Sequence, residues 1–378
     1  MTKRRLFLLA GLIALPLLLT GIAFLYRAHV TQRDLEKWQT YQESARTRGE
    51  DLGVEAWLPP QPADAENFFT HPWILGFLTG ESSPQAEAAA SMQPWPGLGL
   101  DGYELRVGDE EAGEPVKSWF EDKPEDRDRV LETVRTHAAD LAAIREAAAR
   151  SHSRAQLDLS QGYQGGLDAW CNLSDLGTLL GVHADAALAA GDEATAVADL
   201  EALLRLGAHF RGQHFLLSLV IGAGIEARAL AVIEAGATKK AFSPASKQRL
   251  RAARRSGKVE EEIASTLRVE RGMYLKTVAQ FVTKAGRQNQ DVLPYKPERL
   301  VATNSLFFCE MLDSALLPAP SVAGWRDFDQ RIATLRAPAK SGNLTAIATA
   351  TLLATGGVAS GMVVQEEEFD RVYKLLDP

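Results

Sequence analysis

Residues 173–207 read LSDLGTLLGVHADAALAAGDEATAVADLEALLRLG, and this stretch decides the fold. Its apolar side chains recur at the spacing of one helical face, once before Gly191 and again after it. The two stripes are Leu173, Leu176, Leu180, Ala184 and Ala187, then Val197, Leu200, Leu203 and Leu204. Glycine can adopt the left-handed conformation that ends a helix, and Asp192 can cap the start of the next helix. The stretch therefore predicts two antiparallel helices joined by a very short turn.

The same stretch resembles the second half of a tetratricopeptide repeat. Gly191, Ala196 and Leu200 fall where that motif places a turn glycine, a small residue and a large apolar residue. The first half departs from the motif, because His183-Ala184 replaces a Leu-Gly pair and Ala187 replaces a large aromatic residue. No period of about 34 residues recurs along the chain. The resemblance implies a helical-hairpin architecture and carries no peptide-binding function.

Similar signals continue through residues 123–378, where alanine is abundant and runs of β-branched residues are scarce. Pro124 suits a first helical turn, and the helix that it opens is expected to continue to about Arg150. Phe215–Ile221 is apolar nearly all round, which predicts a helix in the centre of the core. Further helices are expected after Ser243 and over 260–282, 298–317 and 322–336. We predict an all-α body of stacked antiparallel helical hairpins.

The N-terminus carries the strongest single signal, KRRLFLLAGLIALPLLLTGIAFLYR at residues 3–27. Leu6–Tyr26 holds no charge and would span about 31 Å as a helix, close to the thickness of a bilayer core. We predict an uncleaved transmembrane anchor within residues 1–27. The cations at 3–5 predict a cytoplasmic N-terminus and an extracytoplasmic, periplasmic body. Two alternatives stay open: a signal peptide cleaved near Gly21-Ile22-Ala23, and a buried soluble helix.

Two segments separate the anchor from the body. Residues 28–48 alternate in charge and predict a solvated helical stalk. Residues 49–122 are rich in proline and glycine, which predicts an irregular segment that wraps over the body. The segment holds four tryptophans, Trp57, Trp73, Trp95 and Trp119. We expect their rings to dock on the body; the alternative is that they line a groove for a peptide or sugar.

A second uncharged run covers residues 344–364, LTAIATATLLATGGVASGMVV. It has the length of a membrane span and contains Gly357-x-x-x-Gly361, a spacing found where membrane helices touch. Its threonines and glycines weaken insertion, and the tail behind it is acidic. We therefore expect a buried soluble helix, with a second span as the alternative.

Composition restricts the classes of partner. The net charge is −8, and the first 33 residues carry cations without a single acid, so the body is more acidic than the whole chain. An acidic body argues against nucleic-acid binding. The two cysteines, Cys171 and Cys309, could form one disulfide outside the cytoplasm, but two separate buried thiols are the expectation.

Motifs of known chemistry are missing from the sequence. None of the seven histidines belongs to an H-E-x-x-H motif, and there is no phosphate-binding or dinucleotide-binding glycine loop. Gly357-Val-Ala-Ser-Gly361 places its serine one position too late for a hydrolase elbow. Glu262 and Glu270 lie eight residues apart and could form an acid pair, although a solvated or salt-bridged face is expected. The sequence predicts no cofactor and no metal, and it favours a protein that is not an enzyme.

A block of basic residues follows residue 238 without an acid up to Lys258. Such a block could contact anionic lipid headgroups or an acidic partner. The alternative is a solvated helix that is balanced by Glu260, Glu261 and Glu262. The candidate interaction residues are Lys247, Arg249, Arg251, Arg254 and Arg255.

The layout as a whole resembles a set of uncharacterised bacterial membrane-anchored proteins. These have an N-terminal span, a proline-rich segment that ends near an Asn-aromatic pair, and an all-helical body. The matching residues here are WLPPQPADAENFF at 57–69, with Asn67 and Phe68 as the pair. The resemblance implies an arrangement of segments and brings no activity with it.

Taken together, the sequence favours an interaction or scaffold protein of the cell envelope, with the bilayer and another envelope protein as partners. Two other functions stay open. One is an envelope enzyme that acts on a polymer through carboxylate acid/base residues. The other is a structural protein that uses the basic block on anionic lipid.

Overall fold

The computed structural model describes residues 3–78, 83–92, 118–160, 168–254, 257–288, 297–316, 362 and 365–377. Helices are the regular elements of this part of the chain, so the prediction of an all-α fold is confirmed. The long helices are α1 (Lys3–Thr47), α5 (Pro124–Thr136), α6 (Ala138–Ala148), α7 (Asp168–Ala189), α8 (Glu193–Arg211), α9 (Leu216–Thr238), α10 (Pro244–Ala253), α11 (Val259–Gln288) and α12 (Pro297–Leu316).

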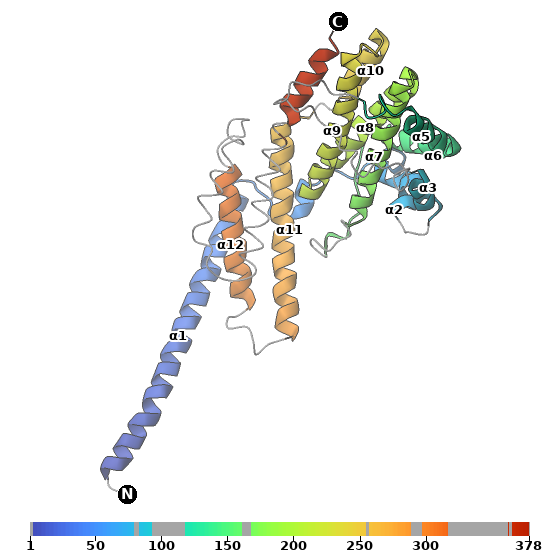
Figure 1. Cartoon of the computed structure of the whole chain (residues 1–378). Helices are drawn as coiled ribbons and strands as arrows, with labels where there is room; N and C mark the ends of the chain where they lie inside the picture. The colour runs from blue at the N-terminus through green and yellow to red at the C-terminus, as the bar shows by residue number, and fades with distance from the viewer. Residues whose placement is uncertain are drawn as a thin grey trace.

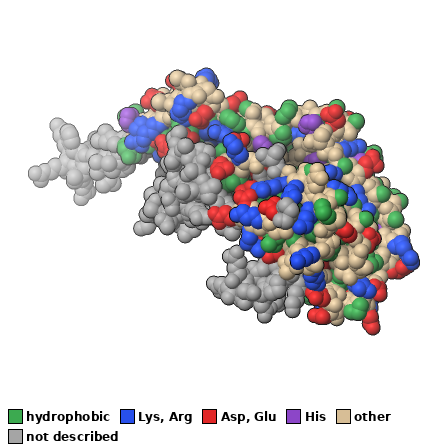
Figure 2. Space-filling model, turned by 90° about the horizontal axis from the view of Figure 1, so that it is seen from above, with side chains coloured by type: hydrophobic (Ala, Val, Ile, Leu, Met, Phe, Trp, Pro, Cys, Tyr) green, Lys and Arg blue, Asp and Glu red, His purple; other side chains and the backbone are tan. Residues whose placement is uncertain are grey.

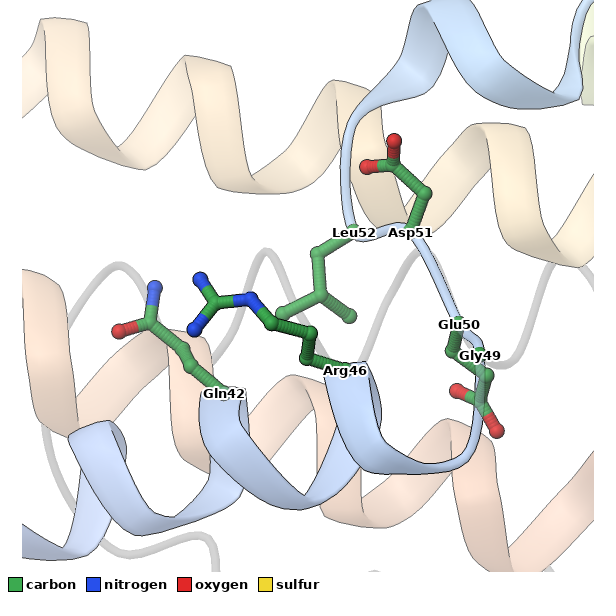
Figure 3. Close-up of a pocket in the computed structure, with 6 residues that line it drawn as sticks. All are labelled: Gln42, Arg46, Gly49, Glu50, Asp51 and Leu52. Atoms are coloured by element: carbon green, nitrogen blue, oxygen red, sulfur yellow. The ribbon is translucent and has the colours of Figure 1, made fainter.

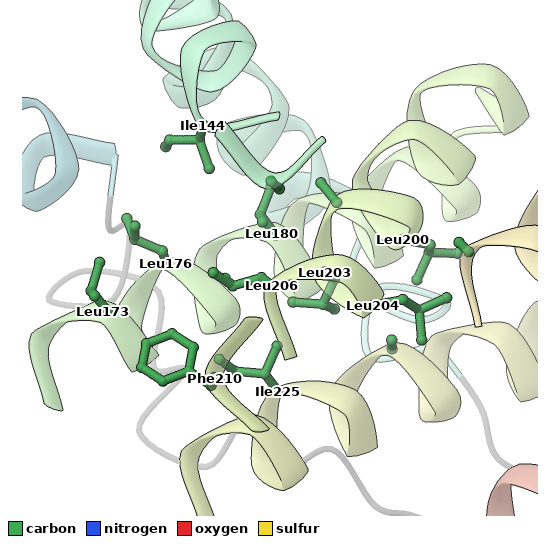
Figure 4. Packing of buried hydrophobic residues seen from close by; sticks show 14 of the residues in the cluster. Ile144, Leu173, Leu176, Leu180, Leu200, Leu203, Leu204, Leu206, Phe210 and Ile225 are labelled. Atoms are coloured by element: carbon green, nitrogen blue, oxygen red, sulfur yellow. The ribbon is translucent and has the colours of Figure 1, made fainter. Parts of the chain in front are cut away.

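Helices α7 and α8 form a hairpin, and α9 packs along both of them. Gly191 has a positive φ of 81° in the turn, and Asp192 caps α8 by accepting a hydrogen bond of 3.1 Å from the Thr195 amide. Figure 4 shows how leucines from the facing sides of α7 and α8 meet with Phe210 and Ile225 between the three helices. This layer is the centre of the hydrophobic core.

Two glycines allow α8 and α9 to approach closely. A Cβ atom added at Gly222 would lie 2.7 Å from the Gly207 carbonyl oxygen and 3.1 Å from the Arg211 amide nitrogen. A Cβ atom added at Gly207 would lie 2.5 Å from the Glu226 side chain. Side chains larger than hydrogen would therefore force the two helices apart at this crossing.

The helix expected from Pro124 to about Arg150 is two helices. The chain leaves helical geometry at His137, where φ is −113° and ψ is 28°. Helix α5 packs on α7, whereas α6 packs on α8. The break redirects the chain between these two neighbours, a tertiary requirement that helical periodicity does not encode.

The segment after α1 contains more helix than its prolines suggested. Pro72 and Pro84 are first residues of helices, where the missing amide hydrogen costs nothing. The short elements are η1 (Val54–Trp57), η2 (Asp64–Glu66), η3 (Phe68–Thr70), α2 (Pro72–Leu78) and α3 (Pro84–Met92). Element η1 lies against α11, since a Cβ at Gly272 would lie 2.6 Å from Val54.

Helix α1 is a single uninterrupted helix of 45 residues. Its N-terminal half projects away from the body, and its C-terminal half packs along α12 (Figure 1). Phe24, Leu25 and Tyr26 stand on the projecting part and are 71%, 69% and 70% exposed. Val30, Thr31 and Asp34 are buried, so the helix packs against the body from about residue 30 onward.

Helix α9 is long and apolar enough to cross a membrane, and within the residues searched it is the helix that meets this test. Most of its apolar window is buried inside the body, where it packs against α7 and α8. The second uncharged run, 344–364, lies outside the described residues except for the buried Met362. The helix expected at 322–336 also lies outside them.

Candidate functional site

The packed half of α1 is held by polar contacts with α12. The Tyr41 hydroxyl donates a hydrogen bond of 2.8 Å to Oδ2 of Asp313. Nearer the projecting end, Nε of Arg299 donates a hydrogen bond of 2.8 Å to Oδ2 of Asp34, whose carboxylate is almost fully buried. Burial raises the pKa of Asp34, but the hydrogen bonds from Arg299 and Arg33 outweigh it and lower the pKa overall. Two charge-assisted contacts thus fix α1 at both ends of its docked half.

Arg271 lies beneath the point where α1 ends. Its side chain is 1% exposed and bonds to Oε2 of Glu50 at 3.1 Å, with Oδ1 of Asp313 at 3.5 Å. Arg48 approaches the same two carboxylates. Burial raises the pKa of Glu50, while hydrogen bonds from Arg48 and Arg271 lower it to a net value below its ordinary one. We call Tyr41, Arg48, Glu50, Arg271 and Asp313 the stalk-junction cluster.

A recess of about 500 Å³ opens beside this cluster. Figure 3 shows Gln42 and Arg46 on one side of α1, with Leu52 from the following loop next to them. Gly49, Glu50 and Asp51 complete the described part of its lining. The recess is open and polar, and it combines one guanidinium with two carboxylates. Small-molecule sites are usually enclosed and mostly apolar. An open, charged recess such as this one is better suited to a contact with another surface.

A second ionic cluster lies deeper, between α8, α9 and α11. Arg211 is 1% exposed and donates to Glu226 at 2.7 Å and to Glu262 at 2.7 Å and 2.9 Å. Burial alone would lower the pKa of Arg211, but the two carboxylates raise it. The guanidinium makes three hydrogen bonds to the buried Glu226 and the partly buried Glu262, which is the pattern of a structural ion cluster.

Three polar atoms near this cluster are buried without a hydrogen-bond partner in the described structure: Nδ1 of His214, Nη1 of Arg154 and Oγ1 of Thr266. His214 also has a positive φ of 61°. Burial lowers the pKa of both His214 and Arg154. His214 thus marks a strained corner in the turn between α8 and α9.

The basic block lies on α10 and just after it, and three of its arginines pair within the chain. Arg249 forms a two-point ion pair with Glu201 at 2.9 Å. Arg251 bonds to Asp377, and Arg254 bonds to Glu366 and Asp370. Lys247 forms no ion pair with a described residue, and Arg255 lies outside the described residues. Basic and acidic side chains are interspersed over the face in Figure 2. The acids that face this block come mainly from the C-terminus, not from Glu260–Glu262.

The three described tryptophans of the proline-rich segment do not gather into one groove. Trp73 is buried, and its indole donates a hydrogen bond of 2.9 Å to Asp140. Trp57 packs partly buried on the main core, with Arg268 4.7 Å from its ring centre. Trp119 packs on a separate small cluster around Phe120 and has Lys123 3.6 Å from its ring centre. Trp95 lies outside the described residues.

The alternative acid pair is not arranged for acid/base chemistry. Glu262 pairs with Arg211, whereas Glu270 accepts a hydrogen bond of 2.8 Å from the Leu216 amide. Within the described residues, no group of three His, Cys, Asp or Glu side chains could hold a metal ion. Cys309 is a free, buried thiol, and burial raises its pKa to about 12. The side chain of Cys171 lies outside the described ones.

Sequence reasoning missed the residues that join the segments. Asn67 is fully buried: its Oδ1 accepts hydrogen bonds from the amides of Arg154 and Phe69, and its Nδ2 donates to the Arg154 carbonyl. Gln213 binds the same loop through Ala155 and Ser153. The Asn-aromatic pair marked Asn67 as part of a motif, but no local pattern identified its partners, because they lie about 90 residues away.

The comparisons with known proteins gave no relatives: no family model, no curated protein and no solved structure matches this chain. The function therefore has to be argued from the geometry described above.

Proposed function

We propose that the chain is a single-pass membrane protein and acts as an interaction scaffold of the cell envelope. Its N-terminus would lie in the cytoplasm, and its body of stacked helical hairpins would lie on the outer side of the membrane. The bilayer is the first partner, through Leu6–Tyr26, and another envelope protein is the second.

The observation that carries this proposal is the continuity of α1. One helix begins in the uncharged run and ends in the stalk-junction cluster, without a break between the two. The exposed Phe24, Leu25 and Tyr26 lie where the apolar run meets water-soluble structure, and aromatic residues are enriched at that level of a membrane. A continuous, docked helix would hold the body at a defined position relative to the bilayer.

A scaffold accounts better for the body than an enzyme does. Several strongly buried charges of the described residues, among them Arg211, Glu226 and Arg271, form ion pairs with one another or with nearby acids. The recess at the stalk junction is open and carries groups suited to polar surface contacts. The lipid-binding alternative is weakened because Arg249, Arg251 and Arg254 pair with acids of the same chain.

Liposome flotation tests the anchor. A variant with Leu12→Arg and Leu18→Arg places two charges in the apolar run, at a cost of about 3 kcal/mol each near the bilayer centre. The control, Gln39→Arg with Glu43→Arg, adds cations to exposed positions of the same helix. We expect the control and the unmodified chain to float with the vesicles and the first variant to stay in the soluble fraction. Equal flotation of all three would refute the anchor.

A further inference from the structure

The C-terminal residues 365–375 form a helix that lies beside α9 and α10 (Figure 1). Its buried side chains are Phe369, Val372, Tyr373 and Leu376, and all four belong to the main hydrophobic cluster. Their positions follow i, i+3, i+4 and i+7. This is the spacing with which an amphipathic helix docks into a groove on another helical protein.

We call the surface of α9 and α10 that this helix covers the α9–α10 groove. Polar contacts lie along both of its sides. On the α10 side, Arg254 donates hydrogen bonds of 3.0 Å to Glu366 and 2.8 Å to Asp370. Its guanidinium also lies 5.8 Å and 5.3 Å from the ring centres of Phe369 and Tyr373. Arg251 donates to the Leu376 carbonyl and to the Asp377 carboxylate. Two arginines of α10 therefore recognise the acids and the C-terminal end of the docked helix.

On the α9 side, contacts of opposite polarity fix the register. Glu234 accepts hydrogen bonds of 2.7 Å and 2.6 Å from the Arg371 guanidinium. The Gln365 side-chain amide donates to the Ala223 carbonyl of α9 at 2.7 Å. On α10, the Leu250 carbonyl accepts a hydrogen bond of 3.2 Å from the Tyr373 hydroxyl. A helix with acids at the positions of Glu366 and Asp370, a basic residue directly after the second acid, and four apolar anchors fits this surface.

We propose that the α9–α10 groove is a binding site for an acidic amphipathic helix of a partner protein, and that the chain's own C-terminal helix is its resident occupant. Residues 317–361 separate this helix from Leu316, so the occupant is joined to its groove by a long stretch of sequence. Charge complementarity selects the partner: acids must face Arg251 and Arg254. The inference rests on the scaffold function and names its interaction surface.

The test uses a fluorescent peptide of residues 362–378 and the full chain in detergent. Glu366→Arg with Asp370→Arg in the chain weakens the resident helix, because two arginines then face Arg254. We expect this variant to bind the peptide at least 10-fold more tightly than the unmodified chain. Adding Arg254→Glu to it should abolish the gain, and a peptide with alanine at 369 and 373 should not bind. Failure of the folded variant to bind the peptide would overturn the proposal.

If that variant does not fold, a second measurement on the unmodified chain tests the proposal. Hydrogen exchange of residues 365–376 is followed in the unmodified chain while unlabelled peptide is added. Faster hydrogen exchange in this helix alone, with α9 and α10 still protected, supports displacement of the resident helix by the peptide. Protection that is lost only on global unfolding would show that the helix is a fixed part of the core. Dimers formed on displacement, detected by light scattering, would assign the groove to a second copy and also overturn the proposal.

These assays need no membrane. Loss of peptide binding with normal flotation would refute the proposed binding site but not the membrane anchor. Normal peptide binding with loss of flotation would refute the anchor alone.

Discussion

The Tyr41 hydroxyl and the Asp313 carboxylate are joined by a hydrogen bond of 2.8 Å, although 272 residues separate them in the sequence. Burial raises the pKa of Tyr41, so the phenol keeps its proton near neutral pH and is the donor in this contact. The same carboxylate faces Arg48 and Arg271. This contact holds the C-terminal half of α1 against α12.

Replacing Asp313 should therefore loosen the stalk. Asp313→Asn keeps the shape but removes the negative charge beside the buried Arg271, and we expect a loss of about 2–3 kcal/mol in the free energy of unfolding. Asp51→Asn is the matched control, because that side chain is exposed and forms no ion pair with a described residue. Asparagine can still accept the hydrogen bond from the Gly53 amide, so the change should cost less than about 0.5 kcal/mol. Urea unfolding in detergent, followed by circular dichroism, compares the two. Equal losses would contradict the role of the cluster.

The crossing of α8 and α9 should tolerate no side chain at Gly222. In Gly222→Ala the new methyl would meet backbone atoms at 2.7 Å and 3.1 Å, and we expect a loss of about 2 kcal/mol or more. Gly181→Ala is the control in α7, where the nearest atom would lie at 3.5 Å. There the better helix propensity of alanine should leave stability unchanged or raise it by up to about 1 kcal/mol. Thermal unfolding measures both, and a harmless Gly222→Ala would exclude the close approach.

Asn67 should be irreplaceable even by its nearest isostere. Asn67→Asp keeps both acceptor contacts but sets a carboxylate oxygen against the Arg154 carbonyl, to which the amide now donates at 2.9 Å. We expect a destabilisation of about 3 kcal/mol. Asn304→Asp disturbs a single contact to the Leu300 carbonyl within α12 and should cost about 1 kcal/mol or less. Unfolding of both variants at the same urea concentration would show that the hydrogen bonds of Asn67 to Arg154 do not hold the two segments together.

His209 should make the fold sensitive to acid. Burial lowers its pKa to about 4 in the folded chain, against about 6.5 when unfolded. Between these values the unfolded chain binds more protons, so stability falls as the pH drops through this window. The loss between pH 7 and pH 5 should be about 2 kcal/mol.

His209→Gln can preserve a donor to the Ala148 carbonyl and should remove that share of the pH dependence. Burial also lowers the pKa of His71 and His214, so a residual slope of the same sign should remain. Urea unfolding at several pH values would contradict the account if His209→Gln and the unmodified chain had the same slope.

Some parts of this structure could be read from the sequence and others could not. The all-α class, the Gly191 turn and the Asp192 cap follow from local rules, because helix ends and apolar stripes depend on neighbouring residues. The break at His137 and the helices that begin at Pro72 and Pro84 did not follow. Helix α5 packs on α7, whereas α6 packs on α8. These tertiary contacts break the helix at His137, although the sequence pattern predicted one continuous helix.

The candidate sites were harder to predict than the fold. The basic block was visible as a run of charge, but Arg254 pairs with acids more than 100 residues further on and Arg249 pairs with Glu201, 48 residues earlier. Spacing in the sequence carries no signal for such contacts. No sequence pattern singled out Arg211 or Arg271, because neither lies in a charge pattern that indicates burial. The tryptophans were recognisable as docking residues by type alone, and the surfaces that they contact depend on the tertiary fold.

The measurement that tests the account most directly is the intact mass of the native protein, with N-terminal sequencing, from separated membrane and soluble fractions. We predict a membrane-bound chain that retains residues 6–26, because the anchor and the docked stalk are one helix. A soluble mature chain that begins near Phe24 would contradict the anchor and, with it, the proposed place of this scaffold in the envelope.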